Sequence, residues 1–214
     1  MGTAHYFNGT NAYTVVPNFY NYSALTLYFV FMSPNVNKRG GLLRYFWWWN
    51  NYGFDIEQSV DSNGYLSVRF GAGTTSVTDH PAYPLRNFTW YSVAVVLPSQ
   101  GVDVAKLYVN GSYVKSYSYG YAPPSSPTDL YIGAVAPANL SLYGYMSQVL
   151  IYNRALSSTE IQQIYNTPNN PPTNGLVLWF SNPDFTNECC KAIWIDKSGN
   201  GNNGKLYNVQ MVYY

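Results

Sequence analysis

The sequence has 214 residues, of which 47% are hydrophobic, 18% are aromatic and only 10% are charged, and its formal net charge is +1. An average soluble domain has about 25% charged residues, so the surface of this protein must rely mainly on neutral polar side chains. A net charge this close to zero excludes the basic footprint that nucleic acids and anionic membranes attract. The composition therefore predicts a globular protein without a nucleic-acid partner.

No apolar run of the sequence approaches the roughly 20 residues that a membrane-spanning helix needs. The longest run, 25–32, has the length of a strand. Residues 1–6 have neither the basic flank nor the apolar core of a secretory signal peptide. The 23 tyrosines and the low charge nevertheless suit a protein of an extracellular, cell-surface or virion setting.

Turn signals rich in Asn and Gly divide the chain into short stretches of β-branched and aromatic residues, which is typical of an all-β protein. All-β sandwiches often have about 200–250 residues, so the length favours a single domain, 1–214. Side chains alternate in 53–60, with Asp55 and Glu57 on one face. The continuous apolar run 93–97 predicts a central strand. In chain order, the expected strands are 4–7, 12–16, 24–32, 41–48, 53–60, 65–70, 90–97, 104–109, 112–118, 129–134, 144–152 and 175–180.

One short helix is expected near the end of this series, at 157–165. Ser157 and Glu160 have the spacing of a capping box, and Ile161 is followed by apolar residues three and four positions later. The next segment, 166–174, is rich in Pro and Asn, which predicts a linker in an extended conformation.

Three groups of motifs, in this order and spacing, resemble the laminin-G-like, concanavalin A-like lectin and glucanase family. They are the aromatic-Asn-Gly opening at 6–17, the Trp-Tyr-Ser-Val-Ala-Val run at 90–95 with the hairpin at 106–114, and the closing stretches 130–133 and 144–157. The resemblance implies an antiparallel β-sandwich of two sheets, a jelly roll, with a lectin-like function. The expected strand lengths suit two facing sheets about 10 Å apart.

Relatives in this family often have Asp and Glu just before the closing strand, where this sequence has Met146, Ser147 and Gln148. Calcium prefers carboxylate and carbonyl oxygen ligands. The replacement therefore argues against the structural calcium site that the resemblance implies, and no cofactor is expected.

The chain thus has a main body at 1–165, followed by the linker and the segment 175–214. This segment resembles the stretch with which domains of the same family normally begin. Two explanations remain open: a circular permutation in which the segment closes the sandwich within its own chain, or a tandem array in which it is donated to a neighbouring subunit. The nine linker residues span roughly 30 Å when extended, so closure within the chain is favoured. We then expect 176–180 to run antiparallel to 148–152.

Asp55 and Glu57 are the only carboxylate pair with the alternate spacing that glycan-cleaving relatives use. The third acidic position, two residues earlier, holds Gly53, so we interpret the pair as a solvent-exposed strand face. Neither His5 nor His80 has a nearby nucleophile motif, and His80 is expected in a loop. The glycine-rich stretch 199–204 lacks the Lys-Ser/Thr of a phosphate loop and is read as a turn. No enzymatic activity is predicted.

An aromatic cluster at the end of the strand 41–48 is the strongest binding signal. Alternate side chains of a strand face opposite sides, so three consecutive tryptophans cannot all enter the core. Sugar rings stack on exposed aromatic faces while amides bond their hydroxyls, which predicts a glycan platform. Packing of the exposed tryptophan on a neighbouring subunit or a long loop is an equally weighted alternative. The platform consists of Trp47, Trp48, Trp49, Asn50, Asn51 and Tyr52.

Covalent modification has candidates of two kinds. Glycosylation sequons begin at Asn8, Asn21, Asn87, Asn110 and Asn139. This number is close to chance, and a modified asparagine would require export; Asn110, in a hairpin turn, is expected to be the most accessible. The adjacent Cys189 and Cys190 cannot link distant segments, which leaves free thiols, an interchain bridge or a vicinal disulfide, the last disfavoured by geometry.

Two functions follow from these patterns. The first is a non-enzymatic recognition module that binds a glycan or a cell-surface protein. The alternative is a structural subunit of an extracellular filament or virion, which self-associates by exchanging strands or domains and so hides a sheet edge.

Overall fold

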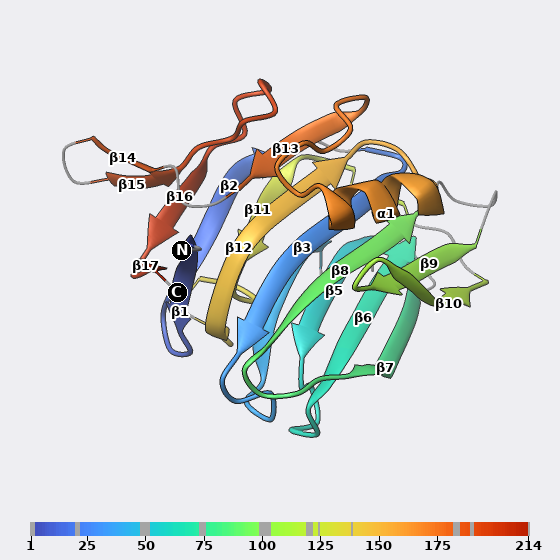
Figure 1. The fold of residues 1–214 in the computed structure, drawn as a ribbon, viewed down its shortest axis with the longest axis horizontal. Helices are drawn as coiled ribbons and strands as arrows, with labels where there is room; N and C mark the ends of the chain where they lie inside the picture. Colours follow the sequence, from blue (N-terminus) through green and yellow to red (C-terminus); the bar gives the residue numbers. More distant parts are fainter. Residues whose placement is uncertain are drawn as a thin grey trace.

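The computed structural model describes residues 3–19, 22–47, 52–72, 76–98, 104–118, 122–123, 125–137, 139–181, 185–188 and 191–213. These residues form two antiparallel sheets that face each other, with the helix α1 (Ser158–Asn166) lying on the outer face of one of them (Figure 1). The fold class that the sequence predicts, a two-sheet antiparallel β-sandwich, is confirmed.

Each sheet combines strands from distant parts of the chain. In spatial order, the eight-stranded sheet consists of β10 (Ser112–Tyr117), β9 (Ala105–Val109), β8 (Thr89–Leu97), β3 (Leu25–Ser33), β12 (Tyr143–Tyr152), β1 (Thr3–Asn8) and β17 (Gln210–Tyr213), with β13 (Leu176–Phe180) also paired to β12. The nine-stranded sheet consists of β14 (Phe185–Glu188), β15 (Lys191–Trp194), β16 (Gly204–Tyr207), β2 (Tyr13–Phe19), β11 (Thr128–Ile132), β4 (Gly40–Trp47), β5 (Tyr52–Gln58), β6 (Tyr65–Ala72) and β7 (Ser76–Pro84).

Strand β8 explains why a continuous apolar run predicts a central strand. Val93, Val95 and Leu97 point into the core between the sheets. Ala94 and Val96 point the other way, into a smaller apolar cluster under α1. The strand is therefore buried on both faces, and polar side chains would be costly on either one.

The helix forms as its capping signals predict. Ser157 Oγ accepts a hydrogen bond from the Glu160 backbone N–H at 3.2 Å, and a Glu160 carboxylate oxygen accepts one from the Ser157 N–H at 2.9 Å. Ile161 and Ile164 are buried against the outer face of the eight-stranded sheet, whereas Tyr165 is 42% exposed. Ile164, rather than Tyr165, thus completes the apolar stripe.

The sequence patterns missed five strands: β7 and β14 to β17. β7 contains Pro81, but it lies at the edge of its sheet, where a missing backbone N–H is tolerated. The prediction that His80 lies in a loop is wrong, because His80 is part of β7. The other four strands have four residues each and little alternation.

The linker prediction for 166–174 is wrong in its conformation. The segment is not uniformly extended, because it turns at Pro168 and Asn169, and Pro171 is buried. Gln148 Nε2 also donates a hydrogen bond to the Pro168 carbonyl at 2.7 Å. This packing holds the segment against the eight-stranded sheet.

The pairing predicted for 176–180 is confirmed. β13 runs antiparallel to β12, with Phe180 opposite Val149. β1 and β13 lie end to end along the same edge of β12, since β1 pairs with 143–146. β16 then pairs with β2 and β17 with β1, so the two ends of the chain lie side by side (Figure 1). The last part of the chain thus contributes strands to both sheets.

Candidate functional site

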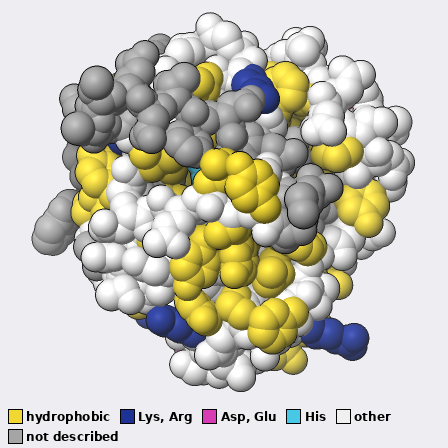
Figure 2. Space-filling view, turned by 60° about the vertical axis from the view of Figure 1, so that its left-hand side comes forward, with side chains coloured by type: hydrophobic (Ala, Val, Ile, Leu, Met, Phe, Trp, Pro, Cys, Tyr) yellow, Lys and Arg dark blue, Asp and Glu magenta, His cyan; other side chains and the backbone are white. Residues whose placement is uncertain are grey.

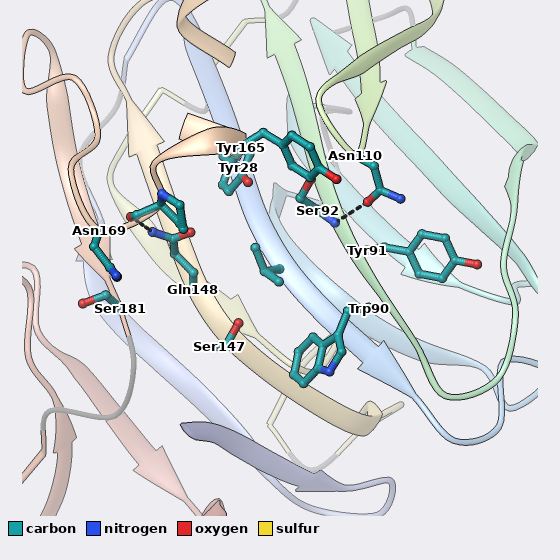
Figure 3. Close-up of a pocket in the computed structure, with 12 residues that line it drawn as sticks. Tyr28, Trp90, Tyr91, Ser92, Asn110, Ser147, Gln148, Tyr165, Asn169 and Ser181 are labelled. Carbon is teal, nitrogen blue, oxygen red and sulfur yellow. Dashed lines mark hydrogen bonds between the residues drawn. The ribbon is translucent and has the colours of Figure 1, made fainter. Parts of the chain in front are cut away.

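A pocket of about 410 Å³ lies on the outer face of the eight-stranded sheet, beside the C-terminal end of α1 (Figure 3). This volume is within the range of about 300–1,000 Å³ that small-molecule sites occupy. The residues that line it are all uncharged: Tyr28, Val30, Trp90, Tyr91, Ser92, Asn110, Ser147, Gln148, Tyr165, Pro168, Asn169 and Ser181.

A β-bulge in β12 shapes the floor of the pocket. Met146 lies opposite Phe31 and Gln148 lies opposite Val30, so Ser147 is an extra residue in β12. The bulge lets Met146 face the core while Gln148 faces outward. Without it, strict alternation would direct Gln148 to the core face. Ser147 itself lies in the pocket, between Gln148 and Trp90 in the view of Figure 3.

Gln148 provides a hydrogen-bond acceptor at the base of the pocket. The residue is 4% exposed, and its Nε2 is already bonded to the Pro168 carbonyl. Its Oε1 is buried and has no hydrogen-bond partner within the described part of the chain. Buried polar atoms are normally paired, and leaving one unpaired costs about 1–3 kcal/mol. Oε1 is therefore an unpaired acceptor beneath the pocket surface, and a ligand hydroxyl reaches it only when the Gln148 side chain turns toward the pocket.

Asn110 is held rigidly at the opposite side of the pocket. It lies in the turn between β9 and β10 with a φ of 50°. Its backbone N–H donates to the Ser92 carbonyl at 2.8 Å, and its Oδ1 accepts from the Ser92 N–H at 3.0 Å (Figure 3). The next residue, Gly111, has a φ of 74°, and a Cβ atom there would lie 2.9 Å from the Tyr165 ring. Glycine therefore permits the turn to close on the helix.

Tyrosine hydroxyls and one indole ring complete the lining. Burial raises the pKa of Tyr28 to about 12, so its hydroxyl remains protonated at neutral pH and can donate as well as accept. Trp90 is half-buried and projects from β8 toward the space in front of Ser147 (Figure 3). An aromatic face beside amides and hydroxyls suits a ligand that has both an apolar face and many hydroxyl groups.

The predicted aromatic platform lies only partly within the described residues. Trp47 and Tyr52 are paired at the ends of β4 and β5, in the sheet opposite the pocket. Trp48, Trp49, Asn50 and Asn51 lie outside the described residues, as do Asn21, Cys189 and Cys190. The pocket is thus a second candidate site, on the other sheet.

The interpretation of Asp55 and Glu57 as a solvent-exposed strand face is wrong. Asp55 is 4% exposed and Glu57 is 6% exposed. Arg39 donates two hydrogen bonds to Glu57, at 2.7 and 3.1 Å, and Arg44 Nη1 lies 3.7 Å from an Asp55 carboxylate oxygen. Arg44 and Arg69 flank Asp55 across the sheet. Burial and the neighbouring Glu57 raise the pKa of Asp55, whereas Arg44 opposes this shift.

The exposure of the sequon asparagines differs from the prediction that the hairpin turn makes Asn110 the most accessible. Asn110 is half-buried in the pocket wall, whereas Asn87 and Asn139 are exposed. The Asn8 side chain is also hydrogen-bonded, since its Oδ1 accepts from three backbone N–H groups of the following turn. The prediction that Asn110 is the most accessible sequon is therefore wrong.

Metal-binding clusters and membrane-spanning helices are both absent from the residues that the structure describes. Within the described ranges, no group of three or more His, Cys, Asp or Glu side chains is arranged to hold a metal ion. No helix in the same residues is long and apolar enough to cross a membrane.

The pocket was missed because its residues give weak signals in the sequence. Trp90 and Asn110 belong to motifs that indicate the family, but nothing local shows that they approach Gln148. The only sequence signal was the replacement of family acidic residues by Met146, Ser147 and Gln148. Two of these three positions line the pocket.

The chain belongs to the concanavalin A-like lectin/glucanases superfamily, whose family model matches residues 7–162. No match was found among curated proteins. Among solved structures, a "putative carbohydrate binding protein" from Bacteroides ovatus is similar at 19% identity with a TM-score of 0.73. That match covers 99% of this chain, which spans only 60% of the length of the other.

Two more distant structures are also similar. A heptameric SAP-like pentraxin from Limulus polyphemus has 16% identity and a TM-score of 0.59, covering 98% of this chain and 94% of the pentraxin. Domain 4 of an extracellular arabinanase from Geobacillus stearothermophilus, solved with arabinotriose, has 13% identity and a TM-score of 0.61, covering 76% of each chain. At these identities the likeness concerns the fold.

Proposed function

We propose that this protein is a non-enzymatic carbohydrate-recognition module that acts outside the cell, on a cell or virion surface, and binds an uncharged glycan in the pocket around Trp90. The observation that carries the proposal is the uncharged lining, in which an indole ring lies beside amide and hydroxyl groups. Sugars present apolar C–H faces that stack on aromatic rings and hydroxyls that bond to amides. The lining residues include no carboxylate, imidazole or thiol to supply general acid–base chemistry.

Two relatives support this proposal by their printed descriptions. One is described as a "putative carbohydrate binding protein", and the other is an arabinanase domain in complex with arabinotriose.

A glycan array with the wild type and Trp90→Ala tests the proposal. We expect the wild type to bind a set of neutral glycans and Trp90→Ala to bind them at least about tenfold more weakly, which corresponds to about 1.4 kcal/mol. Tyr213→Ala is the matched control, because Tyr213 is an exposed tyrosine of β17 (65% exposed) outside the pocket. It should bind as the wild type does.

The same array distinguishes the pocket from the aromatic platform. If Trp48→Ala loses binding while Trp90→Ala retains it, the glycan site is the platform at 47–52 and not the pocket. Absence of binding to every glycan by the folded wild type would contradict the carbohydrate-recognition function altogether.

A further inference from the structure

A row of side chains leads away from the pocket on the same face of the eight-stranded sheet. Trp90, Met32, Tyr145 and Tyr6 lie directly opposite one another on β8, β3, β12 and β1. Directly opposed residues of antiparallel strands point to the same face. All four are half-buried, whereas the residue that follows each along its strand is buried. We call these four residues, which are three aromatic residues and Met32, the aromatic row.

The row starts inside the pocket and leads away from it. Trp90 belongs both to the row and to the pocket lining. Neighbouring strands are about 4.8 Å apart, so the row extends about 14 Å from Trp90 to Tyr6. At its far end the Tyr6 and Tyr145 ring centroids are 5.1 Å apart. Hydrophobic side chains gather at the centre and in the lower part of the side of the molecule that carries the chain ends, with Lys and Arg side chains below them and also near the top of the view (Figure 2).

The dimensions and chemistry of the row suit a linear chain of sugar units. The spacing between strands is close to the repeat of a chain of linked sugar rings, so successive units can each meet one side chain of the row. The tyrosines offer both a ring face and a hydroxyl. A ligand confined to the pocket would leave this surface unused.

The charge of the surface decides between a neutral and an ionic chain. None of the described residues of the row or of the pocket lining carries a charge. Lys38 Nζ lies over the Tyr143 ring, 5.2 Å from its centroid, and the Tyr143 ring centroid is 6.3 Å from that of Tyr6. This cation therefore lies beside Tyr143, and it belongs neither to the row nor to the pocket lining. Nucleic acids and acidic polysaccharides depend on several Lys or Arg contacts, which the row does not provide.

We infer that the aromatic row forms a series of subsites for successive units of an uncharged linear polysaccharide, with one unit held in the pocket. The inference rests on the proposed function and adds the ligand class to it. It predicts that affinity depends on chain length and that each residue of the row acts only on chains long enough to reach it.

Calorimetric titration of the full chain with arabino-oligosaccharides and cello-oligosaccharides of one to six units tests this inference. In the series that binds, we expect affinity to rise at least about tenfold between two and five units and then to level off. Tyr145→Ala should weaken binding of the five-unit chain about tenfold and leave the two-unit chain within about twofold of the wild type. Trp90→Ala should weaken both.

Tyr6→Ala provides a second, independent variant at the far end of the row. It should affect only the longest chains, and Tyr213→Ala should affect none. Thermal unfolding of each variant identifies any general loss of structure, and if Tyr145→Ala does not fold, Tyr6→Ala decides the question.

The outcomes separate the two proposals. Equal affinity at all chain lengths, with Tyr145→Ala and Tyr6→Ala unchanged and Trp90→Ala weakened, overturns the row and keeps the pocket. No binding in either series or on the glycan array overturns both. Tighter binding of heparin, oligo-dT or a proline-rich peptide than of any neutral glycan, with the same dependence on Tyr145, overturns the assignment to a neutral polysaccharide.

Discussion

At the scale of single residues, His5 is an unusual component of the core. It is 1% exposed, and both ring nitrogens are buried without a hydrogen-bond partner in the described structure. Its ring centroid lies 4.2 Å from that of Trp194, which in turn stacks on Phe180 at 4.7 Å. Burial lowers the pKa of His5 to about 4. The neutral imidazole thus functions as an apolar ring that joins β1 to the C-terminal strands.

This burial predicts an acid-sensitive term in the free energy of unfolding. Because the pKa is about 6.5 in the unfolded chain and about 4 in the folded one, only the unfolded chain takes up a proton as the pH falls between these values. The contribution of His5 to the free energy of unfolding is therefore constant above pH 6.5. Below pH 6.5 it falls by about 1.4 kcal/mol per pH unit, and the loss reaches about 3 kcal/mol at pH 4. Denaturant unfolding of the wild type and His5→Phe at pH 7 and pH 4 measures this loss.

Comparing the two proteins isolates the histidine from other titrating groups. The Arg154 side chain, by hydrogen bonding, lowers the pKa of Glu160 to about 2, so this pair also weakens as acid approaches that value. The raised pKa of Asp55 acts in the opposite direction. Both contributions are shared by His5→Phe. An equal loss of stability in both proteins would show that His5 does not cause the acid sensitivity.

At the scale of elements, the turn at 196–203 fastens the C-terminal strands to β13. Asp196 is 8% exposed and accepts hydrogen bonds at 2.9 Å from the backbone N–H groups of Trp179, Ser198 and Asn202. Asn202 Nδ2 also donates to the Val177 carbonyl at 2.8 Å. The glycine-rich stretch thus forms a structural turn, as its composition predicts, and covers backbone groups of β13.

We expect Asp196→Ala to destabilise the fold by about 3 kcal/mol, since three backbone donors lose a charged acceptor. Asp129→Ala is a suitable control, because Asp129 accepts a hydrogen bond from the Asn18 N–H at 3.1 Å, and it should cost about 1 kcal/mol. The free energy of unfolding from urea titrations checks both values. Equal costs for the two variants would mean that the turn does not depend on Asp196.

At the scale of the whole molecule, we propose that residues 175–214 close the sandwich within their own chain, as a circular permutation of the family order. β13 continues the line of β1 along β12, and β17 pairs with β1 through Thr3 and Tyr213. Closure within one chain avoids the loss of translational freedom that exchange between two subunits would require. The alternative, assembly through strand or domain exchange, makes the same contacts between different chains.

Removal of 175–214 should therefore leave an insoluble or partly unfolded protein. The deletion uncovers the edge of β12 that β13 occupies and removes Leu178, Phe180 and Trp194 from the core. Solubility, circular dichroism and unfolding of the 1–174 fragment measure the effect. A soluble monomer that unfolds cooperatively would contradict the proposal. For the full chain, light scattering should give a monomer at all concentrations, whereas dimers or polymers would favour exchange.

Local signals in the sequence were sufficient for the sandwich and for several of its elements. The Ser157–Glu160 capping box, the apolar run of β8 and the Asn-Gly turns each depend on neighbouring residues, so the sequence alone determined them. The family motifs supplied the order of the strands, and hence the pairing of β13 with β12.

Tertiary structure alone decided which side chains meet. Tyr6, Met32, Trp90 and Tyr145 are far apart in the sequence and align only because of the register of four strands. The bulge at Ser147 turns Gln148 outward, although alternation from Met146 would point it into the core. Likewise, cross-strand arginines enclose Asp55, so that a polar face became buried. Periodicity is a property of neighbours along the chain, whereas register, bulges and burial depend on long-range pairing that no local pattern records.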